Sequence, residues 1–171
     1  STQAKTLFPY TTLFRSIDLY GFSAGGGAII NAIGALNTTR FDPYLSKWNI
    51  TAADKQKMLQ AIQKGVIILD APLKSVREII AFRGQSRDLL ILQKRYGSND
   101  MEPVDSLKYL QGLILHVIVH FQTPDEVLFN RDDLLFYNRL KQYNPEGKND
   151  LVLGNDGGHN SYHRSLWEFY H

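Results

Sequence analysis

The sequence predicts an α/β fold in which a mostly parallel sheet is covered by helices on both faces. Short apolar runs alternate along the chain with longer amphipathic stretches, the order expected for strands joined by crossover helices. The apolar runs lack the polar alternation of a half-buried strand, so each is expected to be buried on both sides. With 171 residues, of which 43% are hydrophobic and 21% charged, the chain is long enough for one domain with a core.

Four apolar runs are predicted to be the strands of this sheet: 17–20, 66–69, 113–121 and 151–153. Amphipathic spacing and helix-end signals predict the helices: 28–36, 51–64, 75–96, 103–110, 131–142 and 161–170. Thr51 and Asp54 match a capping box, and Gly65 is expected to end the same helix in the left-handed conformation. Residues 37–49, which contain Pro43, are predicted to be a loop.

The composition excludes several classes of function. Lys and Arg number 19 against 17 for Asp and Glu, which is too little positive charge for a nucleic-acid binder. The absence of cysteine excludes disulfides, thiolate metal sites and a cysteine nucleophile. The longest apolar runs, such as 112–121, have about ten residues and are too short to span a bilayer as a helix. We therefore expect no nucleic-acid partner and no membrane span.

The N-terminal segment is expected to have a different origin from the rest of the chain. Residues 6–16, with the sequence TLFPYTTLFRS, resemble the in-frame translation of a common sequencing-library adapter. We therefore expect residues 1–16 to be non-native and to contribute nothing to the native fold. The alternative is a genuine β-rich segment, because Leu, Phe, Tyr and Thr all favour strands.

The loop after the first predicted strand contains the pattern Gly21-x-Ser23-x-Gly25. A strand that turns at once into a helix holds its central residue in a strained conformation with crowded neighbours. Glycines two residues before and after remove side chains that would clash, and the serine hydroxyl is left projecting. The alternative is a glycine-rich turn that binds a phosphate at a helix N-terminus. Because neither G-x-G-x-x-G nor G-K-[ST] is present, the pattern favours a nucleophile.

A serine nucleophile needs a histidine base, and one of the five histidines is well placed for that role. His159 lies in a glycine-rich loop directly after the last predicted strand. His116 and His120 lie four apart in an apolar strand, where two hydrogen-bonded sheet-face histidines are expected rather than a metal pair. His163 and His171 are expected to face solvent.

The base in turn needs an acid, for which the sequence offers three aspartates. Asp125 lies in the loop after the strand predicted over 113–121, and Asp70 closes the preceding strand. Asp156 is in the same turn as His159, where its carboxylate would reach the imidazole Nδ1 only awkwardly. Asp125 is the first choice and Asp70 the competitor. The alternative for either is an aspartate that forms a turn or caps a helix.

Three segments together resemble the active-site blocks of α/β-hydrolase-fold serine hydrolases of the esterase, lipase or prolyl-oligopeptidase type: GFSAGG at 21–26, VHFQTPDEV at 119–127 and GGH at 157–159. The order Ser, Asp, His along the chain is also that family's order. The resemblance implies that Ser23 is the nucleophile, Asp125 the acid and His159 the base. It also implies that the backbone N–H of Ala24 is one donor of the oxyanion hole, with Gly21 and Gly25 shaping the turn.

The chain departs from the family pattern in two respects. Phe121 stands where the family often has glycine, close to the proposed acid. The four predicted strands correspond to the last four of the family's larger sheet, so residues 17–171 are expected to be the C-terminal part of the domain. The other part would carry the loop that donates the second oxyanion-hole N–H.

The resemblance implies a hydrolase that cleaves a carboxylic ester through a Ser-His-Asp triad and an acyl-enzyme, with no cofactor and no metal. The partner that it implies is a small-molecule ester or a peptide substrate. One alternative is a prolyl-oligopeptidase-like peptidase, which carries the same three blocks. The other is a non-catalytic interaction domain of the same fold. Without the second oxyanion donor, the chain of 171 residues is itself expected to be inactive or nearly so.

Overall fold

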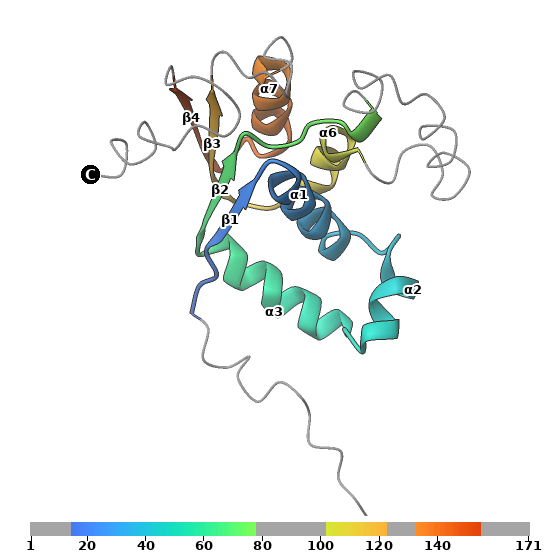
Figure 1. Ribbon diagram of the computed structural model, residues 1–171. Coiled ribbons are helices and arrows are strands. Elements are labelled where there is room, and N and C mark those ends of the chain that lie inside the picture. The colour runs from blue at the N-terminus through green and yellow to red at the C-terminus, as the bar shows by residue number, and fades with distance from the viewer. Residues whose placement is uncertain (1–14, 78–101, 123–132, 155–171) are drawn as a thin grey trace, which may run out of the picture.

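Four parallel strands form one sheet in the spatial order β1-β2-β3-β4 (Figure 1). The computed structural model describes residues 15–77, 102–122 and 133–154. The strands are β1 (Leu19–Phe22), β2 (Val66–Asp70), β3 (His116–Gln122) and β4 (Lys148–Gly154). All three strand pairs are parallel, and each strand overlaps one of the four predicted apolar runs. The prediction of an α/β fold with a parallel sheet is therefore confirmed.

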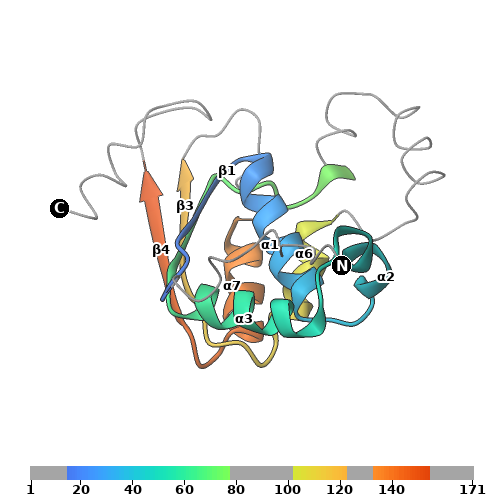
Figure 2. The ribbon, with the colours of Figure 1, turned by 90° about the horizontal axis from the view of Figure 1, so that it is seen from below.

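The described helices lie on one side of this sheet (Figure 2). They are α1 (Ala24–Leu36), α2 (Asp42–Leu45), α3 (Ala52–Gln63), α6 (Pro103–Ser106) and α7 (Asp133–Tyr143), with 3₁₀ turns over Ser46–Trp48 and Leu107–Leu110. The helices predicted over 161–170 and over most of 75–96 lie outside the described residues. Helical cover on the opposite face of the sheet therefore stays a prediction.

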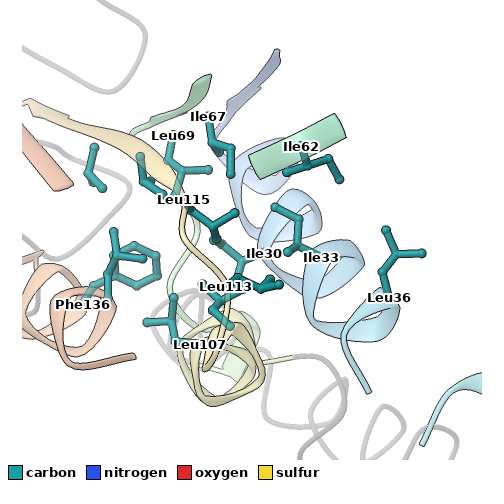
Figure 3. Packing of buried hydrophobic residues seen from close by; sticks show 14 of the residues in the cluster. Ile30, Ile33, Leu36, Ile62, Ile67, Leu69, Leu107, Leu113, Leu115 and Phe136 are labelled. Atoms are coloured by element: carbon teal, nitrogen blue, oxygen red, sulfur yellow. The ribbon is translucent and has the colours of Figure 1, made fainter. Parts of the chain in front are cut away.

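The hydrophobic core lies between the sheet and these helices (Figure 3). Alternate residues of the strands point into it, because successive side chains of a strand lie on opposite faces. Its fully buried members include Ile30 and Ile33 of α1, Ile67 and Leu69 of β2, Val117 and Val119 of β3, and Phe136 and Leu140 of α7. Burying a side chain of this size contributes about 1.5–3 kcal/mol, so this layer holds the strand ends in a fixed arrangement.

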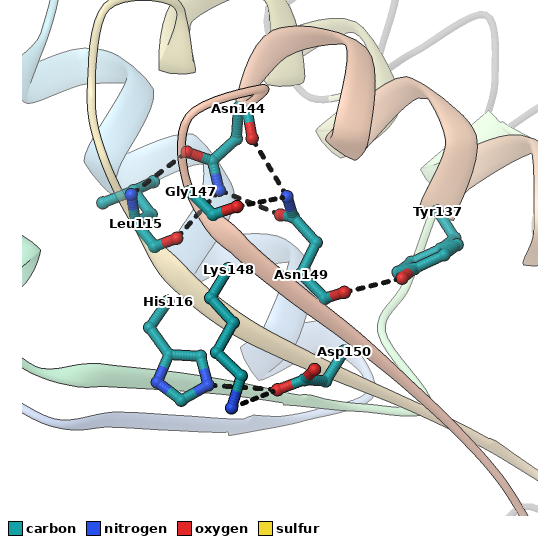
Figure 4. Close-up of polar contacts among 8 residues, drawn as sticks. All are labelled: Leu115, His116, Tyr137, Asn144, Gly147, Lys148, Asn149 and Asp150. Atoms are coloured by element: carbon teal, nitrogen blue, oxygen red, sulfur yellow. Dashed lines mark hydrogen bonds and ion pairs between the residues drawn. The ribbon is translucent and has the colours of Figure 1, made fainter.

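A buried asparagine joins α7 to the starts of β3 and β4 (Figure 4). The Asn144 side chain accepts a hydrogen bond from the Leu115 N–H and donates one to the Leu115 carbonyl, each at 3.0 Å. It also donates to the side-chain oxygen of Asn149 in β4, at 2.9 Å. Asn144 thus supplies to Leu115 the pair of backbone-like bonds that a neighbouring strand would otherwise provide.

The structure corrects three local expectations. Residues 37–49 are not all loop, since they contain α2, and Pro43 lies in its first turn, where no backbone N–H is needed. Helix α1 begins at Ala24 rather than at residue 28. Gly65 does not adopt the left-handed conformation, and α3 ends instead at Lys64 in a right-handed geometry. A Cβ on Gly65 would lie 2.0 Å from the carbonyl oxygen of Ile17, so close chain approach is what requires glycine there.

Within residues 15–77, 102–122 and 133–154, no helix is long and apolar enough to cross a membrane. The same residues contain no group of three or more His, Asp or Glu side chains that could hold a metal ion.

Candidate active site

Ser23 links β1 directly to α1 and has a strained backbone, with φ 49° and ψ −117°. Non-glycine residues with positive φ are uncommon, and such strain costs about 1–3 kcal/mol. A serine that caps a helix has an extended backbone, and its hydroxyl accepts a hydrogen bond from the first turn. Ser23 precedes α1 but makes no side-chain capping bond. Its unusual conformation is therefore not explained by helix capping, and it matches the strained turn expected of a nucleophile.

The glycine before this turn has a clear steric role. A Cβ on Gly21 would lie 2.7 Å from the backbone of both Gly25 and Gly26, which could be relieved only by moving the turn. A Cβ on Gly25 would meet no described atom within 4 Å. The steric explanation therefore holds for Gly21, whereas among the described residues no neighbour explains the need for glycine at position 25.

The start of α1 presents a backbone donor beside Ser23. Ala24 is the first residue of the helix and is exposed, and an N–H in the first turn has no acceptor within its own helix. The Ser23 carbonyl accepts hydrogen bonds from Gly26 and Gly27 at 3.1 and 3.3 Å, which closes the first turn of α1. The Ala24 N–H therefore has the position in the helix that the oxyanion-hole assignment requires.

A buried polar cluster lies next to Ser23, at the carboxyl end of the sheet. Asp70 and His120 are paired across β2 and β3, and both are fully buried. Asp70 Oδ1 lies 2.8 Å from His120 Nδ1, and the Tyr20 hydroxyl donates to Asp70 Oδ2 at 2.6 Å. Burial of the hydroxyl, together with its hydrogen bond to Asp70, raises the pKa of Tyr20 above its ordinary value. Within the described residues, each carboxylate oxygen of Asp70 has a hydrogen-bond partner.

The predicted site residues fall into two groups. Gly21, Ser23, Ala24 and Gly25 lie together at the turn between β1 and α1. Asp125 and His159 lie outside the described residues, as do Asp156, His163 and His171. The strands that precede the predicted acid and base, β3 and β4, run parallel to β1 and end at the same edge of the sheet. This is the edge at which open α/β sheets carry their active groups.

His116 and His120 are both hydrogen-bonded, as the sequence predicted, and the partner of each is a carboxylate. His116 Nε2 lies 3.1 Å from Asp150 Oδ2 of β4, and His120 binds Asp70. The pairing of His120 with Asp70, and the contribution of Tyr20, were not predicted. The sequence does contain a signal for this pairing, since Asp70 and His120 each lie near the end of an apolar run. The signal is not sufficient, because only the register of β2 with β3 makes the two residues neighbours.

Comparison with known proteins addresses the fold. No protein-family model and no curated protein sequence matches the chain. Among solved structures, the Pyrococcus furiosus esterase Pf2001 superposes with a TM-score of 0.52 at 16% sequence identity, over 91% of this chain and 49% of the esterase. Acetyl xylan esterase 1 from Thermoanaerobacterium sp. superposes with a TM-score of 0.53 at 12% identity, over 91% of this chain and 44% of that one.

The chain has the α/β-hydrolase fold. It spans about half the length of the Pf2001 esterase, so the four described strands represent part of that fold. A third structure, the acylaminoacyl peptidase of Pyrococcus horikoshii, has a lower TM-score of 0.48 at 14% identity, over 86% of this chain and 20% of the peptidase.

Proposed function

We propose that this α/β-hydrolase chain carries the nucleophile, acid and base of a serine hydrolase that cleaves carboxylic esters. The observation that carries the proposal is the conformation of Ser23, which has a strained backbone with positive φ and does not cap α1 through its hydroxyl. The choice of an ester as substrate is supported by the two superposed structures, both of which are esterases.

In the proposed mechanism, the Ser23 hydroxyl oxygen attacks the ester carbonyl carbon while His159 accepts the hydroxyl proton. The Ala24 N–H donates to the oxygen of the tetrahedral intermediate, and one such donor contributes about 3 kcal/mol. The intermediate collapses to an acyl-enzyme as His159 returns the proton to the departing alcohol. Water then attacks the acyl-enzyme with His159 as base, which releases the acid and regenerates Ser23.

Asp125 is proposed as the carboxylate that holds His159 in the correct tautomer. The competing carboxylate, Asp70, is already bound through Oδ1 to His120 and through Oδ2 to Tyr20. These bonds give Asp70 a role in joining β1, β2 and β3, whereas Asp125 follows β3 in the sequence and has the position that the family resemblance gives to the acid. We therefore assign the acid to Asp125.

Covalent labelling of Ser23 tests the proposal. The chain is incubated for an extended time with a fluorophosphonate probe, and intact-mass spectrometry counts the probes that are added. We expect one added probe per chain, and none for Ser23→Ala, because the probe reacts only with an activated serine. Ser46→Ala is a matched control, since Ser46 is an exposed serine on the 3₁₀ turn after α2, where its hydroxyl binds the Asp42 carbonyl.

Two results would contradict the assignment: labelling of Ser23→Ala at the parental rate, or an unlabelled parent chain that circular dichroism shows to be folded. The latter would favour the non-catalytic alternative. Substrate class is tested separately with p-nitrophenyl acetate and an acyl-alanine p-nitroanilide. Amide cleavage with a kcat/KM equal to that for the ester would assign a peptidase instead.

A further inference from the structure

The loop that follows β2 binds the backbone of Ser23 on both sides. The Ser23 N–H donates to the Asp70 carbonyl at 2.9 Å, and the Leu73 N–H donates to the Ser23 carbonyl, also at 2.9 Å. Rotation of Ser23 out of its strained conformation would break or bend both hydrogen bonds. Residues 70–73 therefore hold the nucleophile, although they are far from it in the sequence.

The same loop is itself strained and must be held in turn. Ala71 has a φ of 41° and is 1% exposed. Its N–H donates to the His120 carbonyl at 2.8 Å, which fixes the peptide after Asp70 against β3. Positive φ at a buried alanine persists only where the surrounding structure fixes the backbone on several sides. Here the fixed points are the bonds to Ser23 and the bond to His120.

The side chain of Asp70 anchors the start of this loop. It is fully buried, and it joins three strands by accepting from Tyr20 of β1 and binding His120 of β3. His120 is fully buried as well, and a buried polar group that loses its partner cannot be rehydrated. Because one residue supplies both this anchor and the carbonyl that binds Ser23, the side-chain cluster is mechanically coupled to the nucleophile.

We propose that Asp70 and His120 are positioning residues that hold Ser23 in its strained conformation through the backbone of residues 70–73. The catalytic consequence rests on the proposed function, whereas the hold on the Ser23 backbone does not. Loss of the Asp70 side chain lets residues 70–73 relax and releases Ser23 towards an ordinary helix-capping conformation. A displacement of about 1 Å in a catalytic group can reduce turnover about 10²-fold.

A second histidine–carboxylate pair provides a matched control. His116 and Asp150 pair across β3 and β4 at 3.1 Å, at the opposite end of β3 from His120 (Figure 4). His116→Asn removes a pair of the same chemistry from the same strand, but far from residues 70–73. An effect shared by His116→Asn and His120→Asn is therefore a general effect on the sheet. Because His120 is the more buried of the two, only a difference confined to the Ser23 and Leu73 amides belongs to the hold on Ser23.

Amide hydrogen exchange measured by NMR tests the hold directly, without requiring activity. In Asp70→Ala and in His120→Asn, the Ser23 and Leu73 amides are expected to exchange about tenfold faster, because their hydrogen bonds open locally. The amides of Ile67 and Leu69, in the middle of β2, should keep their parental rates. Asp70→Asn, which keeps an oxygen for His120 or Tyr20, should show a smaller effect, and it replaces Asp70→Ala if that variant does not fold.

Steady-state kinetics on p-nitrophenyl acetate add the catalytic readout. Asp70→Ala and His120→Asn should lower kcat about 10²-fold with little change in KM, while His116→Asn stays within about twofold of the parent. The proposal is overturned if Ser23 and Leu73 exchange as slowly in both variants as in His116→Asn, or if all β2 amides accelerate equally. If the two variants show the faster local exchange but the parent chain never reacts with the fluorophosphonate, the hold on Ser23 is retained and the esterase is rejected.

Discussion

Ser23 keeps its strained conformation because two kinds of neighbour act on it. The absence of a side chain at Gly21 leaves room for the turn, and hydrogen bonds from the loop after β2 fix the serine backbone. The G-x-S-x-G pattern was enough to predict the first of these, since glycine spacing is local information. The second depends on Asp70 and Leu73, which the register of β1 with β2 brings to Ser23. Sequence spacing alone contains no information about that contact.

Substitution of Gly21 should therefore damage the turn. In Gly21→Ala, the new methyl group would lie 2.7 Å from backbone atoms of Gly25 and Gly26, which are not the ends of flexible side chains. Overpacking of this kind costs about 1–3 kcal/mol, so we expect a lower Tm. Displacement of Ser23 should also slow fluorophosphonate labelling. Differential scanning calorimetry and intact-mass labelling measure the two effects.

The matched variant is Gly25→Ala, which adds the same methyl group where no described atom lies within 4 Å. Gly25 is exposed in the first turn of α1, and alanine is the better helix former by up to about 1 kcal/mol. Its Tm should equal or slightly exceed that of the parent chain. A Gly25→Ala variant that is destabilised as much as Gly21→Ala would contradict the steric account of the turn.

The assignment of Asp125 as the acid gives another prediction about a single residue. Asp125→Asn removes the charge that selects the productive tautomer of His159, and in a serine protease triad this change lowers kcat about 10⁴-fold. We expect a loss of that order for Asp125→Asn and a smaller one for Asp70→Asn, which acts only through the Ser23 backbone. Ester hydrolysis by the two purified variants gives the ranking. The opposite ranking would make Asp70 the acid.

At the level of elements, a local signal predicts correctly where all of its partners belong to the same element, and it fails where a distant contact or a second meaning of the residue decides the structure. The capping box at Thr51 and Asp54 forms as predicted, because both partners belong to the same helix end. The role given to Gly65 is wrong because its true constraint is the carbonyl of Ile17, which packs against it from a distant part of the chain. The four-residue helix α2 was missed because Pro43 was taken as a loop signal rather than as a first-turn residue.

The capping box predicts a pH-dependent contribution of α3 to stability. Hydrogen bonds to Asp54, first from the Thr51 hydroxyl and then from the Thr51 N–H, lower the pKa of this carboxyl below its ordinary value. A carboxyl with a lowered pKa stabilises the folded state above its unfolded pKa of about 3.9, and this contribution is lost as pH falls through the folded value. Asp54→Ala should therefore lower Tm at pH 7 and have a smaller effect near pH 3.

The control for this prediction is Asp42→Ala. Asp42 lies in the first turn of another helix, α2, and pairs with Lys55 instead of capping its own helix. Thermal denaturation followed by circular dichroism at both pH values compares the variants with the parent. An Asp54→Ala effect that persists unchanged to pH 3 would show that the ionised carboxylate is not what stabilises the start of α3.

At the scale of the whole molecule, the order of the strands shows which edge of the sheet has no partner among the described residues. Within the described residues β1 pairs only with β2, so one edge of the strand that leads to Ser23 has no described partner. The α/β-hydrolase structures that superpose on this chain extend over about twice its length. Apolar runs and glycine spacing were sufficient to predict the four strands and the turn at Ser23. They do not predict what pairs with the free edge of β1.

This arrangement predicts a difference between the chain and a longer product of the same coding region. Such a product would carry, in place of residues 1–16, the natural sequence that we propose to precede Ile17. It should supply the second oxyanion N–H, whose absence costs about 10²–10³ in turnover, and a partner for the β1 edge. We therefore expect the 171-residue chain to have a specific activity on p-nitrophenyl acetate lower by at least that factor, and to self-associate in light scattering. Circular dichroism verifies that both proteins are folded, so that misfolding is not mistaken for the missing donor. Equal specific activity would mean that the Ala24 N–H suffices within these residues, and that the upstream segment adds nothing to the site.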